Sequence, residues 1–175
     1  MHSLSAQLSM VQQNRTIREG LIVGFIGSAS AAVFYGVFDI LSARGAFFTA
    51  DVLGKSVFRG LRDPAVLQLP MQLDWAAIAW YSGLHLIITL IIGLIVVGLV
   101  VHSERRPSHA RMVFGTIVAG FVVTIVAVGL LTSPMRTLLP WWSVVVAHAF
   151  AVLAAGTYLL RKHPDAWNRL SPFGG

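Results

Sequence analysis

The sequence predicts an all-α, polytopic membrane protein built as a bundle of four transmembrane helices. Of its 175 residues, 56% are hydrophobic and only 11% are charged, whereas a soluble domain carries about 25% charged residues. The mean hydropathy of +0.75 is also too high for a soluble domain of this size. The apolar residues gather in four segments, each long enough to cross a hydrocarbon core of about 30 Å at about 1.5 Å per residue.

The four expected spans make up a transmembrane domain of residues 20–160, and they run over residues 20–41, 75–101, 112–131 and 141–160. Residues 1–19 are expected to form a cytoplasmic N-terminal segment, and residues 161–175 a cytoplasmic tail. The first span continues through Val37 and Phe38. It is therefore longer than the apolar core of a signal peptide, and we interpret it as a retained anchor.

Small residues recur at every fourth position of the first span, on one helix face: Gly20, Gly24, Ser28, Ala32 and Gly36. In lipid, where packing replaces the hydrophobic effect between helices, such a stripe allows a second helix to approach closely. Further small residues lie on the third and fourth spans, at Gly115, Ala119, Ala147, Ala151 and Ala155. These faces exceed what a four-helix bundle needs, so we expect other membrane subunits or a second copy as partners.

Basic residues lie mostly at the ends of the apolar segments. Eight Lys and Arg flank the termini and the loop after the second span, and five lie on the other side. The positive-inside rule then places both termini in the cytoplasm. Because the net charge of +6 is explained by these flanks, lipid headgroups are the expected partner of the basic residues and nucleic acid is not.

The loop between the first two spans is expected to contain a short helix. Thr49 suits its N-cap, and Asp51, Lys55 and Arg59 fall four residues apart on one face. Two interpretations remain open. The helix either lies in the membrane interface, or the segment packs over the outer mouth of the bundle.

Three ionisable residues lie within the expected spans: Asp39, His85 and His148. The two histidines are both about 10–15 Å below the outer interface, by the rise of an α-helix. At matched depth they would suit the axial ligands of a b-type haem. The alternative, which we favour, is that each histidine hydrogen-bonds to its neighbours as a contact between helices. No cofactor is therefore predicted.

Asp39 and Tyr81 form a second candidate, a polar or proton site. Tyr81 precedes His85 by one helical turn, and Asp39 lies two residues from the end of the first span. Asp39 could pair with His85 as a proton relay, or with Arg44 or Arg136. At this shallow depth the favoured interpretation is a carboxylate that reaches the headgroups.

The sequence carries no sign of catalysis. It has no cysteine, and it contains no phosphate-binding glycine loop, no nucleophile elbow and no His-x-x-x-His metal motif. We therefore expect a protein that is not an enzyme and binds no metal. The leading interpretation is a structural or accessory subunit of a larger membrane complex. The alternatives are a b-type haem electron-transfer protein and a small transporter or channel subunit.

Four short motifs carry a resemblance to a known group of proteins. They are Phe38-Asp39-Ile40-Leu41, the segment from Phe47 to Gly54, Tyr81 before His85, and the run from Leu159 to Pro164. With them the chain resembles a family of small bacterial four-span integral membrane proteins without an assigned activity. The resemblance implies the four-span architecture and a bacterial inner-membrane setting, and it assigns no role to any residue.

Overall fold

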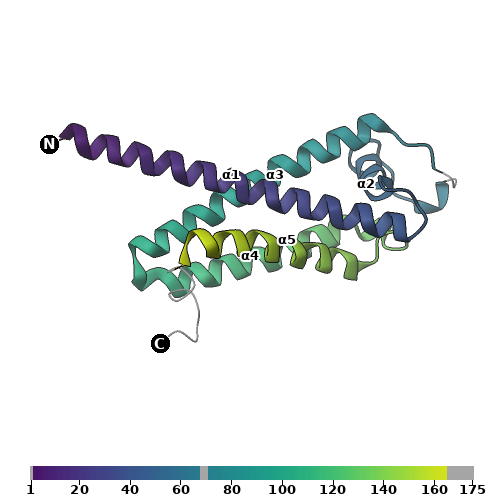
Figure 1. Cartoon of the computed structure of the whole chain (residues 1–175). Helices are drawn as coiled ribbons and strands as arrows, with labels where there is room; N and C mark the ends of the chain where they lie inside the picture. The colour runs from purple at the N-terminus through teal and green to yellow at the C-terminus, as the bar shows by residue number, and fades with distance from the viewer. Residues whose placement is uncertain (1, 68–70, 165–175) are drawn as a thin grey trace.

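The computed structural model describes residues 2–67 and 71–164, with side-chain surroundings from residue 10 onward (Figure 1). In these ranges all regular structure is helical, which confirms the all-α prediction. Short 3-10 turns lie at Pro64–Val66, Pro107–His109 and Ser133–Met135. The helices are α1 (His2–Leu41), α2 (Phe48–Phe58), α3 (Trp75–Arg105), α4 (Ala110–Leu131) and α5 (Trp141–Lys162).

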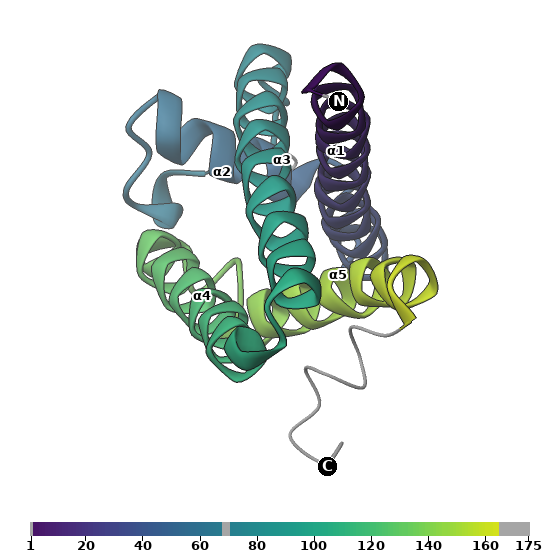
Figure 2. The ribbon, with the colours of Figure 1, turned by 90° about the vertical axis from the view of Figure 1, so that its left-hand side faces the viewer.

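Four of these helices are long and apolar enough to cross a membrane, and together they form a multi-pass helix bundle (Figures 1 and 2). The candidate spans are Met10–Leu41, Trp75–Arg105, Pro107–Leu131 and Trp141–Lys162, and each contains one of the four expected spans. Of the expected tail 161–175, residues 165–175 lie outside the described residues.

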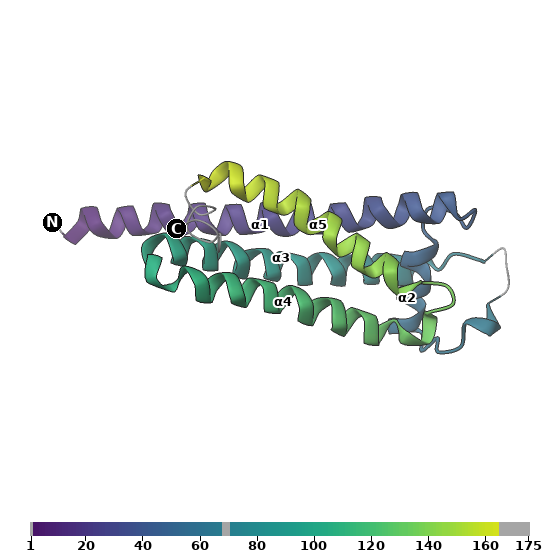
Figure 3. The ribbon, with the colours of Figure 1, turned by 90° about the horizontal axis from the view of Figure 1, so that it is seen from below.

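Helix α1 is much longer than the span expected for it. It begins at His2 rather than near residue 20 and has 40 residues, so its length is about 60 Å, twice the hydrocarbon thickness. Its N-terminal part extends beyond the other helices at the end where α3 meets α4 (Figures 1 and 3). The segment expected as a separate polar piece therefore continues the first span as helix.

The tightest packing in the bundle is the crossing of α1 and α3. A Cβ atom added to Gly24 would lie 2.5 Å from the Cα of Leu90, and one added to Gly93 would lie 2.4 Å from the carbonyl oxygen of Gly20. The two backbones thus touch directly. Of the five small residues on α1, Gly20 and Gly24 pack inside the chain, whereas Ala32 is exposed.

Helix α2 closes the opposite end of the bundle, beside the start of α3 (Figures 1 and 2). Its Phe48 and Val52 are buried with Met135 and Leu139 in one apolar cluster. This burial supports the interpretation of a segment packed over the mouth of the bundle. Val57 and Phe58 of the same helix stay exposed, so a position in the membrane interface stays a prediction.

Candidate functional site

Asp39, near the end of α1, is completely buried and hydrogen-bonded. Its carboxylate accepts bonds from the backbone N–H of Thr49 at 2.7 Å and from the Thr49 hydroxyl at 2.8 Å, and it meets Arg44 at 3.5 Å. The expectation that Asp39 reaches the headgroups is wrong, because the turn into α2 covers it. Pairing with Arg44, one of the open alternatives, is what the structure shows. Thr49 serves Asp39 and is not the N-cap of α2, which is Phe47.

Arg44 joins this carboxylate to the loop between α4 and α5. Its Nη1 donates to the carbonyl oxygen of Leu138 at 2.6 Å. The guanidinium carbon lies 5.0 Å from the ring centre of Phe38 and 4.6 Å from that of Phe48, in cation–π contact with both. Among the described residues, Arg44 Nε is the one buried side-chain nitrogen or oxygen without a hydrogen-bond partner.

A second buried carboxylate, Asp51 of α2, connects this helix to the start of α3. It accepts from Lys55 Nζ at 2.7 Å and from the backbone N–H of Asp74 at 2.9 Å. Lys55 also donates to the carbonyl oxygen of Gln72 at 2.6 Å. Because a buried charge without partners is very costly, these bonds make Asp51 a structural link.

Asp74 forms the N-cap of α3. Its carboxylate accepts from Arg59 at 2.9 Å and from the backbone N–H of Ala77 at 3.0 Å. The Arg59 hydrogen bond, followed by the Ala77 bond, lowers the pKa of Asp74 below its ordinary value, and the same contact raises the pKa of Arg59. We call Asp39, Arg44, Thr49, Asp51, Lys55 and Asp74 the outer cap, after the side of the membrane that the sequence predicts for it. Each of its carboxylates has hydrogen-bond partners, so it holds the helices together.

The two histidines of the spans are held deeper in the bundle. Nδ1 of His85 on α3 shares a hydrogen bond of 3.3 Å with the hydroxyl of Ser28 on α1. Nδ1 of His148 on α5 lies 2.7 Å from the carbonyl oxygen of Val144. A carbonyl only accepts, so Nδ1 of His148 carries the proton. Tyr81 stacks on His85 with ring centres 6.2 Å apart.

The structure gathers Ser28, Tyr81 and His85, which we call the polar cluster. Asp39 lies eleven residues beyond Ser28 on α1, about 16 Å further along the helix. The expected Asp39–His85 relay is therefore wrong. Each of the two histidines is bonded through Nδ1, and neither Nε2 has a hydrogen-bond partner among the described residues.

In the described part of the chain, no three His, Asp or Glu side chains come together as metal ligands. A bis-histidine haem needs only two ligands, whose other ring nitrogens are usually fixed by hydrogen bonds to carbonyls or hydroxyls. The Nδ1 bonds of His85 and His148 have this form.

A third polar group lies at the opposite end of the bundle from the outer cap. His163, just after α5, is 3.0 Å from Glu19 of α1 through Nε2 and 2.8 Å from Glu104 of α3 through Nδ1. Carboxylate oxygens accept, so each ring nitrogen of His163 faces a hydrogen-bond acceptor. Arg15 adds a bond of 2.9 Å to Glu19. We call Glu19, Glu104 and His163 the inner clamp, after the side of the membrane that the sequence predicts for it. The sequence did not predict this contact, because Glu19 precedes the expected first span and His163 follows the fourth.

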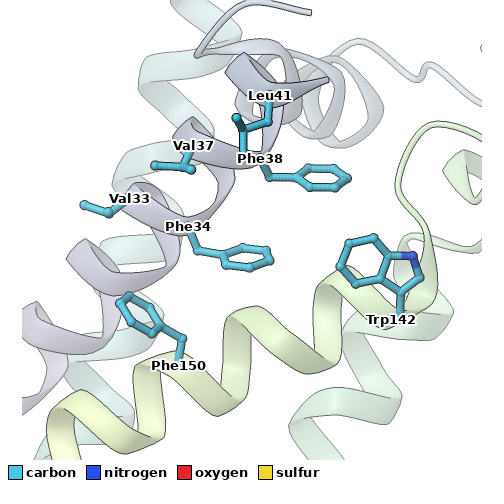
Figure 4. A pocket seen from close by; sticks show the side chains of 7 residues that line it. All are labelled: Val33, Phe34, Val37, Phe38, Leu41, Trp142 and Phe150. Atoms are coloured by element: carbon cyan, nitrogen blue, oxygen red, sulfur yellow. The ribbon is translucent and has the colours of Figure 1, made fainter. Parts of the chain in front are cut away.

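An apolar hollow lies between α1 and α5, on the half of the bundle nearer α2 (Figure 4). It encloses about 280 Å³. We call it the aromatic slot, and it is lined by Val33, Phe34, Val37, Phe38, Leu41, Trp142 and Phe150. It holds none of the sequence-predicted site residues, and its aromatic side chains come from two helices whose relative rotation the sequence does not show.

No protein-family model, no curated protein and no solved structure matches the chain.

Proposed function

We propose that this protein is a structural or accessory subunit of a larger membrane complex in the inner membrane of a bacterium, with both termini in the cytoplasm. The observation that carries the proposal is the part of α1 that extends beyond the bundle (Figure 3). A short stretch of helix that packs on nothing is marginal in water, and most helical stability in proteins comes from packing of an apolar face. A partner surface would supply that packing.

Exposed apolar side chains near the start of α1 support a partner. Met10 is 57% exposed and Val11 68%. Ile17 lies seven residues on from Met10 and so on the same helix face, but it lines a hollow against the end of α3 with Val101 and Arg105. Exposed apolar side chains such as Met10 and Val11 are the kind of surface that another subunit covers.

The distribution of charge supports the proposed orientation. The end of the bundle with the α1 extension is also where α5 ends and α3 meets α4 (Figure 1). Of the eight Lys and Arg expected on the cytoplasmic side, seven lie at this end, and the eighth, Arg169, is outside the described residues. By the positive-inside rule this end faces the cytoplasm.

The experiment is native-gel migration of the protein from source membranes in mild detergent, with mass spectrometry of the band. We expect the wild type in a large, defined complex, and Met10→Glu in a smaller band because its charge enters the apolar face. The matched control is Gln12→Glu, which places the same charge about 160° away by the geometry of the α-helix. Wild-type migration alone or as a small homo-oligomer would contradict the proposal.

A b-type haem electron-transfer protein is the second candidate, and the free Nε2 atoms of His85 and His148 favour it. A transporter or channel subunit is less well supported, because Asp39 is enclosed in the outer cap and does not line a path with His85. The haem candidate is tested by a reduced-minus-oxidised spectrum of the protein from haem-replete cells. Haem bands that His148→Ala removes would support it, and a featureless spectrum of the wild type would end it.

A further inference from the structure

We propose that the aromatic slot holds one hydrocarbon chain of an anionic membrane lipid, with the lipid phosphate against Arg44. This site is separate from the subunit contact proposed above, since it lies on the half of the bundle away from the α1 extension. The inference rests on the chemistry of the slot, its size and the charge at its end.

The walls of the slot suit hydrocarbon and not water. Phe34 and Phe38 of α1 point toward α5 in parallel, with ring centres 6.2 Å apart, and Trp142 meets Phe38 edge-on at 5.6 Å (Figure 4). Phe150 lies at the other end of the slot. A stable internal water needs two to four polar partners, and these walls offer none.

The slot opens sideways to the membrane and is narrow. Val33 is 59% exposed and Val37 51% exposed, so its α1 edge lies on a surface that lipid covers in a bilayer. Its volume of about 280 Å³ is just below that of ligand pockets, which range over roughly 300–1,000 Å³. It therefore has room for part of one hydrocarbon chain and not for a large cofactor.

A positive charge lies at the membrane-surface end of the slot. The guanidinium of Arg44 stacks on Phe38, the same ring that forms the slot wall. Of its five N–H donors, one is taken by the Leu138 carbonyl and one by a long 3.5 Å contact with Asp39. Asp39 itself already accepts two bonds from Thr49. Its Nε–H is buried, so the one remaining N–H on each of Nη1 and Nη2 is the donor that a phosphate can accept.

A second cation strengthens this complementarity. Arg136 is exposed and lies two residues before Leu138, whose carbonyl holds Arg44. Charges of this kind beside a membrane surface favour anionic over zwitterionic lipids. The order along the molecule is therefore apolar slot, aromatic ring and then cation, which matches the order of chain and phosphate in a phospholipid.

The test is thermal unfolding of the purified full chain in detergent micelles, with added phosphatidylglycerol or phosphatidylcholine of identical chains. We expect phosphatidylglycerol to raise the melting temperature saturably and phosphatidylcholine to raise it much less. Val37→Trp fills the slot, so its half-saturating phosphatidylglycerol concentration should rise about tenfold or more, because loss of two buried methylenes has that effect. The control is Val122→Trp on α4, where the native valine is also 51% exposed.

The headgroup half of the site is tested with Arg44→Lys, which keeps the charge but loses the planar fork. Each variant is compared with its own lipid-free melting temperature, so a weakened outer cap does not obscure the result. We expect the preference for phosphatidylglycerol to fall. Equal stabilisation by both lipids, or an unchanged lipid response in Val37→Trp, would overturn the proposal. So would a change in Val37→Trp that appears only as loss of a protein partner in the native gel.

Discussion

At the scale of single residues, the carboxylates of the outer cap show how buried charge is accommodated. Asp39 has no exposure, and its bonds to Thr49 and Arg44 replace the water that an aspartate would otherwise bind. Removing one member of such a pair leaves the other charge uncompensated, which is the main source of large effects from polar substitutions. Asp39 is for this reason the most sensitive polar position of the outer cap.

We expect Asp39→Ala to lower the free energy of unfolding by about 3 kcal/mol, because Arg44 loses its counter-ion and Thr49 loses two bonds. Unfolding in mixed micelles with increasing dodecyl sulfate measures this difference. The control is Asp63→Ala in the exposed loop, where only the backbone N–H of Ala65 loses a partner. Equal effects of the two substitutions would show that Asp39 is not held as described.

The N-cap of α3 gives a pH dependence whose sign follows from Asp74. Arg59 lowers the pKa of this carboxyl in the folded protein below its ordinary value. The unfolded chain therefore binds the proton more readily, and the contribution of Asp74 to stability is present above the ordinary pKa and is lost as the pH falls through the folded one. We expect a loss of stability below about pH 4 that Asp74→Asn reduces. Melting curves of the wild type and Asp74→Asn across this pH range measure the effect. The same pH dependence in both proteins would contradict the prediction.

At the scale of elements, the contact of α1 with α3 depends on particular glycines. Gly24 lies against the Leu90 backbone, whereas Gly27, three residues along the same helix, has no atom within 4 Å of its would-be Cβ. The position of a glycine on the helix therefore decides whether replacing it by alanine stabilises or destabilises the fold. Of the stripe with four-residue spacing, Gly20 and Gly24 meet the α3 backbone and Ser28 bonds to His85 of α3, whereas Ala32 is exposed.

We expect Gly24→Ala to destabilise the fold by about 2 kcal/mol, because a backbone cannot move aside as a side chain can. Gly27→Ala should instead stabilise it by about 0.5–1 kcal/mol, since alanine has less freedom to lose on forming a helix. The pair is compared by unfolding in the same detergent. If both substitutions change the stability in the same direction, the contact between the two backbones is not as described. Because Gly24 packs inside the chain, a loss of assembly in Gly24→Leu would reflect the fold and not a partner.

At the scale of the whole molecule, polar groups join the helices at both ends of the bundle. The outer cap joins α1, α2, α3 and the loop before α5, and the inner clamp joins α1, α3 and the end of α5 through His163. Between them, the helices meet mainly through small and apolar side chains. The order of the bundle is therefore specified at its ends, where polar contacts have direction.

We expect His163→Ala to lower the stability of the bundle by about 2 kcal/mol, because Glu19 and Glu104 each lose a hydrogen-bond partner. His163→Lys serves as the comparison, since its ammonium can donate to a carboxylate but does not reproduce the two ring-nitrogen contacts. Its stability should fall between those of the wild type and the alanine variant. If alanine and wild type melt together, the clamp contributes nothing to the fold.

The sequence by itself determined that this protein has four long apolar helices. It also determined at which end of each helix the Lys and Arg residues lie. A long apolar segment in lipid must satisfy its own backbone hydrogen bonds, so length and hydropathy are sufficient for that conclusion. Only the tertiary structure decided which face of each helix is covered. These spans are apolar on nearly every face, so their composition does not specify how each helix is rotated about its axis. That rotation decides whether Gly24 meets a backbone and which residue His85 bonds to. It also decides whether four aromatic rings line one slot. The sequence did not decide the position of α2 either, because the polar residues on its face can bond to buried partners or to water.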